Sequence, residues 1–134
     1  MTLKEIYSLA DNKGFNIWYY PFKAIKSMST PQGDIAMNTD QLKSKAEELC
    51  HLAHEIGHIE TGSFYQLGAD SVTIRKAESA ANRYAVNLLI SKERLDKFAQ
   101  NGYVTPWQVA EHFGVTEDFA QKAIRYYTDN PYPS

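Results

Sequence analysis

Residues 49–61 read LCHLAHEIGHIET, and this stretch decides the fold. Apolar residues recur through it and before it at spacings of four, three, four and three, which is typical of one face of a long helix. The residues on this face are Leu42, Ala46, Leu49, Ala53 and Ile56. The helix is therefore expected to begin near Asp40 and to carry His54-Glu55-Ile56-Gly57-His58, an H-E-x-x-H motif, in its second half.

The motif predicts a metal site. Residues four apart lie one above the other on a helix, so the imidazoles of His54 and His58 can reach one Zn²⁺. A catalytic zinc takes three protein ligands and keeps an open position, and Glu78 on the next predicted helix can supply the third ligand. Asn82 shares the face of Glu78 and can hydrogen-bond a ligand imidazole from behind. Glu55 lies beside a ligand without being one, so it is placed to act as a catalytic acid/base.

Three other residues of the same helix invite a role. Cys50 lies one turn before His54 and could be considered a fourth ligand. At ~1.5 Å per residue, however, Cys50 and His58 are about 12 Å apart along the helix axis. Cys50 is therefore predicted to be a buried thiol and not a ligand. His51 is predicted to be a polar neighbour of the site. Gly57 costs a helix about 1 kcal/mol relative to alanine, which suggests close packing, by a neighbouring strand.

The remaining sequence predicts an α+β fold with one domain over residues 1–134. Residues 1–40 form a helix, with Thr2 and Glu5 as a capping box, and a small antiparallel sheet of about three strands. The strands are expected at 15–20, 24–29 and 34–38, with a turn at 30–33. Residues 41–90 form the two metal-binding helices, the second from about 73 to 90. Residues 91–134 form further helices, a helix-turn-helix-like hairpin and a frayed tail.

Composition excludes several classes of protein. The 134 residues are 43% apolar and 22% charged, enough for one buried core, and the net charge of −2 disfavours direct binding of nucleic acid. The longest apolar run, about six residues, is far below the roughly 20 that span a membrane. Cys50 is the single cysteine, and Met1 leads into a charged stretch that lacks the apolar core of a signal peptide. A cytoplasmic protein is therefore expected.

The segment from Pro106 to Tyr127 has the small and apolar spacing of a helix-turn-helix, with Gly114 at the turn. Its second helix, however, begins with Glu117 and Asp118, where a DNA-binding helix would meet phosphates. We expect a helical hairpin that packs beside the metal site or contacts a protein.

The pattern His54-Glu55-x-x-His58, then Glu78-x-x-Ala81-Asn82-x-x-Ala85 and Leu88-Leu89, resembles the ImmA/IrrE family of metallopeptidases. The resemblance implies a minimal zincin-like fold and a thermolysin-like metal site, with His54, His58 and Glu78 as zinc ligands and Glu55 as the catalytic acid/base. It also implies a phage or mobile-element protein that cleaves a helix-turn-helix repressor and so acts as an antirepressor.

Two functions are weighed on this basis. The first is a zinc-dependent endopeptidase, with one zinc per chain, acting on a specific protein substrate, most plausibly such a repressor. The second is a non-catalytic, metal-stabilised protein that binds and sequesters a repressor. For the endopeptidase, Tyr65 is the preferred oxyanion stabiliser, with an ordinary packing role as the alternative. The extended run at 34–38 is the expected edge for aligning a substrate backbone.

Overall fold

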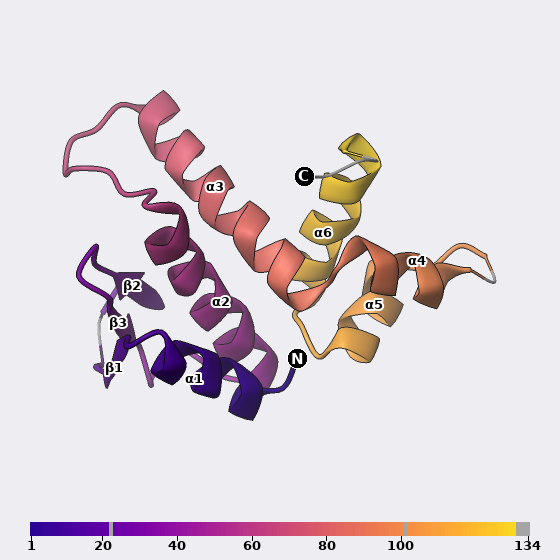
Figure 1. The fold of residues 1–134 in the computed structure, drawn as a ribbon, viewed down its shortest axis with the longest axis horizontal. Helices are drawn as coiled ribbons and strands as arrows, with labels where there is room; N and C mark the ends of the chain where they lie inside the picture. The colour runs from indigo at the N-terminus through magenta and orange to yellow at the C-terminus, as the bar shows by residue number, and fades with distance from the viewer. Residues whose placement is uncertain (22, 101, 131–134) are drawn as a thin grey trace.

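A computed structural model describes residues 1–21, 23–100 and 102–130 (Figure 1). It confirms the α+β class, with a small N-terminal sheet beside a mostly helical body. The elements, in chain order, are α1 (Leu3–Asn12), β1 (Asn16–Tyr19), β2 (Ser27–Ser29), β3 (Asp34–Met37), α2 (Lys45–Thr61), α3 (Ser71–Leu89), α4 (Lys92–Ala99), α5 (Pro106–Phe113) and α6 (Glu117–Asp129).

The centre of the molecule is the pair of helices α2 and α3. Helix α2 lies between α3 on one side and α1 with the sheet on the other (Figure 1). Its buried residues include Leu52, Ala53 and Ile56, which are fully buried in the core. Within the described chain, no helix is long and apolar enough to cross a membrane.

Gly57 explains how closely the two central helices approach. A Cβ added at Gly57 would lie 2.5 Å from the carbonyl oxygen of Ala81 on α3. The prediction of close packing is confirmed, but the neighbour is a helix and not a strand. Ala77 and Ala85, one turn to either side of Ala81, are also buried, because only small side chains fit between backbones this close.

The three-stranded sheet has the order β1-β3-β2. Strands β2 and β3 form an antiparallel hairpin, and its turn is closed by a hydrogen bond of 3.0 Å from Gly33 N to Thr30 O. Strand β1, however, pairs with β3 in parallel, so the predicted fully antiparallel sheet is wrong in that respect. The turn signals at 30–33 specify only the hairpin. The chain between β1 and β2 is long enough to let β1 pair on the far side of β3.

This topology also moves the edge that was expected beside the metal site. Strand β3 is central and is paired on both sides, so it cannot accept a further strand. The strand that contacts α2 at the metal site is β2, an edge strand. The expected substrate edge is therefore Ser27–Ser29 and not 34–38.

Side-chain caps define where the helices begin. The predicted capping box of Thr2 and Glu5 is present, and Thr105 and Gln108 form a second one at the start of α5. Helix α2 begins about five residues later than expected, because the Ser44 side chain accepts a hydrogen bond from Glu47 N and fixes the start at Lys45. Helix α3 begins two residues earlier than expected, because Asp70 caps it.

The C-terminal hairpin of α5 and α6 packs on the end of α3. The Tyr127 hydroxyl donates to the Ile90 carbonyl over 2.7 Å, which ties the last helix to the residue that ends α3. Val109 and Ala123 are fully buried in the core. The frayed tail is expected over residues 129–134. Helix α6 ends at Asp129, and residues 131–134 lie outside the described residues.

We predict that Gly57→Ala destabilises the protein by about 1–3 kcal/mol, although alanine favours a helix by about 1 kcal/mol. The reason is that the added methyl meets the backbone of Ala81, which cannot rotate away as a side chain can. Urea unfolding measures the loss, with Ser79→Ala, at an exposed position of α3, as the control. A Gly57→Ala protein as stable as the wild type would contradict the packing.

Candidate metal centre

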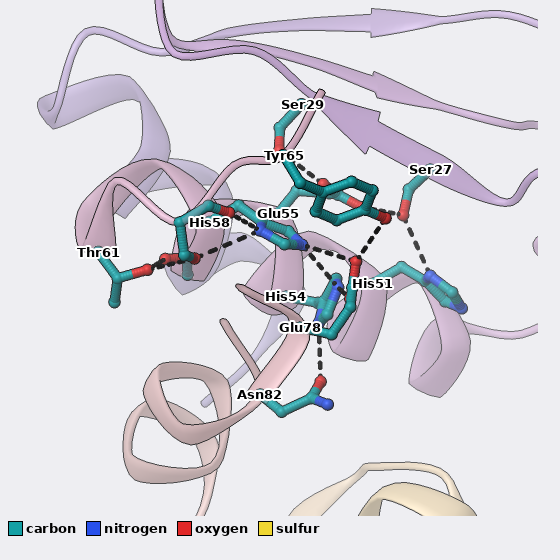
Figure 2. A network of polar contacts seen from close by, with 12 residues as sticks. Ser27, Ser29, His51, His54, Glu55, His58, Thr61, Tyr65, Glu78 and Asn82 are labelled. Atoms are coloured by element: carbon teal, nitrogen blue, oxygen red, sulfur yellow. Dashed lines mark hydrogen bonds and ion pairs between the residues drawn. The ribbon is translucent and has the colours of Figure 1, made fainter. Parts of the chain in front are cut away.

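Helices α2 and α3 bring three side chains to one point (Figure 2). His54 Nε2 and His58 Nε2 lie 3.1 Å apart, since their residues are one helical turn apart on α2. From α3, Glu78 Oε2 lies 2.9 Å from His54 Nε2, and Glu78 Oε1 lies 3.4 Å from His58 Nε2. One ligand atom from each residue lies within 4.8 Å of the others. The structure thus brings together the three residues that the sequence predicts as ligands.

The outer nitrogens of both imidazoles are held by oxygen acceptors. His58 Nδ1 lies 2.5 Å from the carbonyl oxygen of Ser63, and His54 Nδ1 lies 2.8 Å from Oδ1 of Asn82. A carbonyl oxygen can only accept, so each Nδ1 carries the hydrogen. Each Nε2 is then the ring nitrogen left to bind a metal ion, and the two Nε2 atoms face each other and the carboxylate of Glu78.

Three electron-rich groups at this distance repel one another unless a cation lies between them. Two neutral imidazoles and one carboxylate are also the donor set of a catalytic zinc site, and outer hydrogen bonds of this kind fix ring orientation. The residues present therefore fit a divalent metal ion. Asn82 lies where the sequence places it, behind a ligand imidazole.

Glu55 is almost completely buried, with 5% of its surface exposed, and does not belong to the ligand group. Its two carboxylate oxygens accept hydrogen bonds from the hydroxyls of Ser27 and Ser29, each over 2.6 Å. Both serines come from β2, which runs above α2 in Figure 2. The carboxylate is held beside the metal ligands by a different element of the fold.

Sequence reasoning missed Ser27 and Ser29. The signal that could have found them is their spacing, because residues two apart on a strand point to the same face. His51 extends the contact, since its Nδ1 lies 3.1 Å from Ser27 Oγ. Burial lowers the pKa of His51, which favours the neutral imidazole at neutral pH.

Tyr65 and Cys50 take different positions relative to the ligands. The Tyr65 hydroxyl donates to Glu78 Oε1 over 3.0 Å, and this hydrogen bond raises the pKa of the tyrosine. Tyr65 therefore lies at the ligand group, through its contact with Glu78. Cys50 is buried, with its sulfur 3.9 Å from Thr116 Oγ1, and it lies outside the ligand group. Burial raises the pKa of its thiol, as expected for an unreactive core cysteine.

An open cleft of about 540 Å³ runs over the site. Its floor includes the three ligands and Glu55, and one wall is the segment from Ile25 to Ser29. Phe64 and Tyr65 close another side and also border a second hollow of about 690 Å³.

Comparison with known proteins shows which family the chain belongs to. Residues 10–125 match the family of M78 peptidases described as the IrrE N-terminal-like domain. Among solved structures, the chain is similar to the metallopeptidase zymogen abylysin of Pyrococcus abyssi, at 16% identity over 75% of this chain and 98% of that chain, with a TM-score of 0.39. The search of curated proteins found no match.

We predict that the protein retains about one zinc per chain after loading and desalting, and that Glu78→Gln weakens or abolishes this binding. The amide removes the charge that offsets a cation but keeps the size of the side chain. Elemental analysis of the desalted proteins measures the metal. Cys50→Ser serves as the control and should retain zinc, and a loss of zinc in Cys50→Ser would place the thiol in the site.

A separate prediction concerns Asn82. Asn82→Ala should lower zinc affinity by about 10- to 100-fold, because His54 loses the acceptor that fixes its ring and its tautomer. Competition with a chromogenic chelator measures the affinity. Asn87→Ala, on the same helix but without a contact to a ligand residue, is the matched control. Equal affinities for the two variants would argue against the positioning of His54 by Asn82.

Proposed function

We propose that this chain, which belongs to the family of M78 metallopeptidases with an IrrE N-terminal-like domain, is a zinc-dependent endopeptidase acting on a specific protein substrate. The observation that carries the proposal is the buried Glu55 carboxylate beside two imidazoles and a second carboxylate whose lone pairs converge. A metal held only for stability would not need a buried base next to it.

His54, His58 and Glu78 would hold a zinc ion, which would supply a bound water with a pKa near ~7 and a positive charge that polarises a carbonyl group. Glu55 removes the proton from the attacking water, as the water oxygen bonds to the carbonyl carbon of the substrate. It then delivers the proton to the amine nitrogen as the carbon–nitrogen bond breaks. Each carboxylate oxygen has two lone-pair directions, so the serine hydroxyls leave one free on each.

The same surroundings support binding of an extended peptide. The cleft is bordered by an edge strand, and edge strands accept a further strand through main-chain hydrogen bonds. Tyr65 is our candidate for stabilising the oxyanion, because its hydroxyl is at the metal ligands and would need only to exchange Glu78 for the substrate oxygen.

The substrate we propose is a helix-turn-helix transcriptional repressor, so that cleavage derepresses its genes. The support for this substrate is the resemblance of the pattern between His54 and Leu89 to the ImmA/IrrE metallopeptidases. A cytoplasmic location, proposed from the single cysteine, would place the enzyme with such a substrate.

We predict that Glu55→Gln retains zinc but lowers the rate of cleavage by about 10²- to 10⁴-fold. Glutamine keeps the shape of the side chain but cannot take a proton from water at neutral pH. The measurement is cleavage of a helix-turn-helix repressor encoded beside the gene, followed by mass spectrometry, with zinc content determined in parallel. Glu60→Gln, near the end of the same helix and paired with Lys13 away from the site, is the control.

Two outcomes contradict the proposal in different ways. Cleavage by Glu55→Gln at the wild-type rate would remove Glu55 from the chemistry. A wild-type protein that binds the repressor and leaves it intact would favour sequestration, the non-catalytic alternative.

A further inference from the structure

We propose that Ser27 and Ser29 are positioning residues that couple docking of the substrate backbone to the orientation of the Glu55 carboxylate. The inference rests on the proposed endopeptidase function, because it needs a substrate strand in the cleft. It assigns to β2 a second task besides forming the edge, and it names two residues that the metal motif does not contain.

The register of the hairpin places the backbone of these two serines at the open edge. Thr30 N donates to Asp34 O and Asn38 N donates to Lys26 O, each over 2.9 Å, so the even-numbered residues of the segment bond to β3. Backbone groups alternate between the two sides of a strand. The N–H and C=O groups of Ser27 and Ser29 consequently point away from β3, toward the cleft that β2 borders.

The side chains of the same two residues point to α2. Both hydroxyls lie 2.6 Å from a carboxylate oxygen of Glu55, one on each oxygen (Figure 2). Met28, between them, alternates to the opposite face of the sheet, where it lines a depression with Trp18 and Tyr20, and it also borders the cleft. One pair of residues thus offers its backbone to the cleft and its hydroxyls to the base.

His51 fixes the direction of the Ser27 hydroxyl. A serine hydroxyl has one hydrogen, and the Glu55 carboxylate can only accept, so that hydrogen lies on the bond to Glu55. Ser27 Oγ then accepts from His51 Nδ1, which is 3.1 Å away. His51 lies one helical turn before Glu55 on α2. The Ser27 hydroxyl that binds Glu55 is therefore oriented in turn by a residue of the helix that carries Glu55.

Both oxygens need a donor because the last torsion of a glutamate is soft. The carboxylate rotates over a broad range unless contacts fix it. When the base lies outside the reacting geometry, the rate of the chemical step falls while the affinity for the substrate is little changed. When a substrate strand pairs with Ser27 and Ser29, the backbone that carries the hydroxyls becomes hydrogen-bonded on both sides. The base is then held in one orientation while the scissile carbonyl is in place.

The test uses Ser27→Ala, Ser29→Ala and the double variant, with Ser27→Thr and Ser29→Thr as rescues that keep a hydroxyl. Ser8→Ala, at an exposed position of α1, is the matched control, because it makes the same chemical change away from the cleft. For the peptide spanning the cleaved bond of the repressor, kcat should fall about tenfold in each alanine variant and further in the double variant, with KM little changed. The threonine variants should regain most of the rate, and zinc content should be unchanged throughout.

A second readout does not depend on activity. In the metal-free protein, each serine-to-alanine change should lower Tm by roughly 4 °C when residue 55 is glutamate, and by less in a Glu55→Gln background, because hydrogen bonds to a buried charge are the stronger ones. Equal losses in the two backgrounds, or an unchanged kcat in the double variant, would overturn the inference alone. A wild-type protein that cleaves no repressor would overturn the proposed function and this inference with it.

Discussion

The metal centre depends on how closely two helix backbones approach at one point. Gly57 and Ala81 are in contact there, and the ligands surround this contact: His58 directly follows Gly57, His54 precedes it by three residues, and Glu78 precedes Ala81 by three. A separation larger by one methyl group would move Glu78 away from both imidazoles, now 2.9 and 3.4 Å from it. The glycine that weakens the helix locally is therefore what lets α2 and α3 share a site.

The negative charge of the carboxylates at the site is not balanced by a positively charged side chain. Within the described chain, the groups that hold the ligands and Glu55 are neutral: the Asn82 amide, the Ser63 carbonyl, the Tyr65 phenol and the two serine hydroxyls. Lys26, which borders the cleft, is paired with Glu47 over 2.9 Å. Two carboxylates and two inward lone pairs thus meet without a lysine or arginine partner among the described ion pairs. A divalent ion bound by His54, His58 and Glu78 would supply this positive charge.

Sequence gave reliable predictions where the cause is local. The spacing of His54 and His58 needs only helical geometry, and the predicted capping box of Thr2 and Glu5 depends on residues three apart. Predictions failed where the cause is distant. The parallel pairing of β1 with β3 and the edge position of β2 are decided by which strands meet in space. Ser27 and Ser29 were missed because their partner, Glu55, lies 28 and 26 residues away and on a different kind of element.

The residues of the site are oriented by the fold and not by the metal alone. Each imidazole is fixed at its outer nitrogen, Glu78 by a phenol and Glu55 by two serine hydroxyls. The groups that make these contacts come from three separate parts of the chain: β2, α3 and the loop that joins α2 to α3. In such a site, little of the free energy of metal binding is lost to ordering the ligand side chains.

In a small protein whose metal builds the fold, the ligands would lack these supports, since metal binding and folding would be one event. Here the core under α2, formed by Leu52, Ala53 and Ile56, buries apolar surface that no ligand residue contributes. The hydrogen bonds around the candidate metal centre therefore favour accurate placement of these side chains, which the proposed role of Glu55 as a base would require.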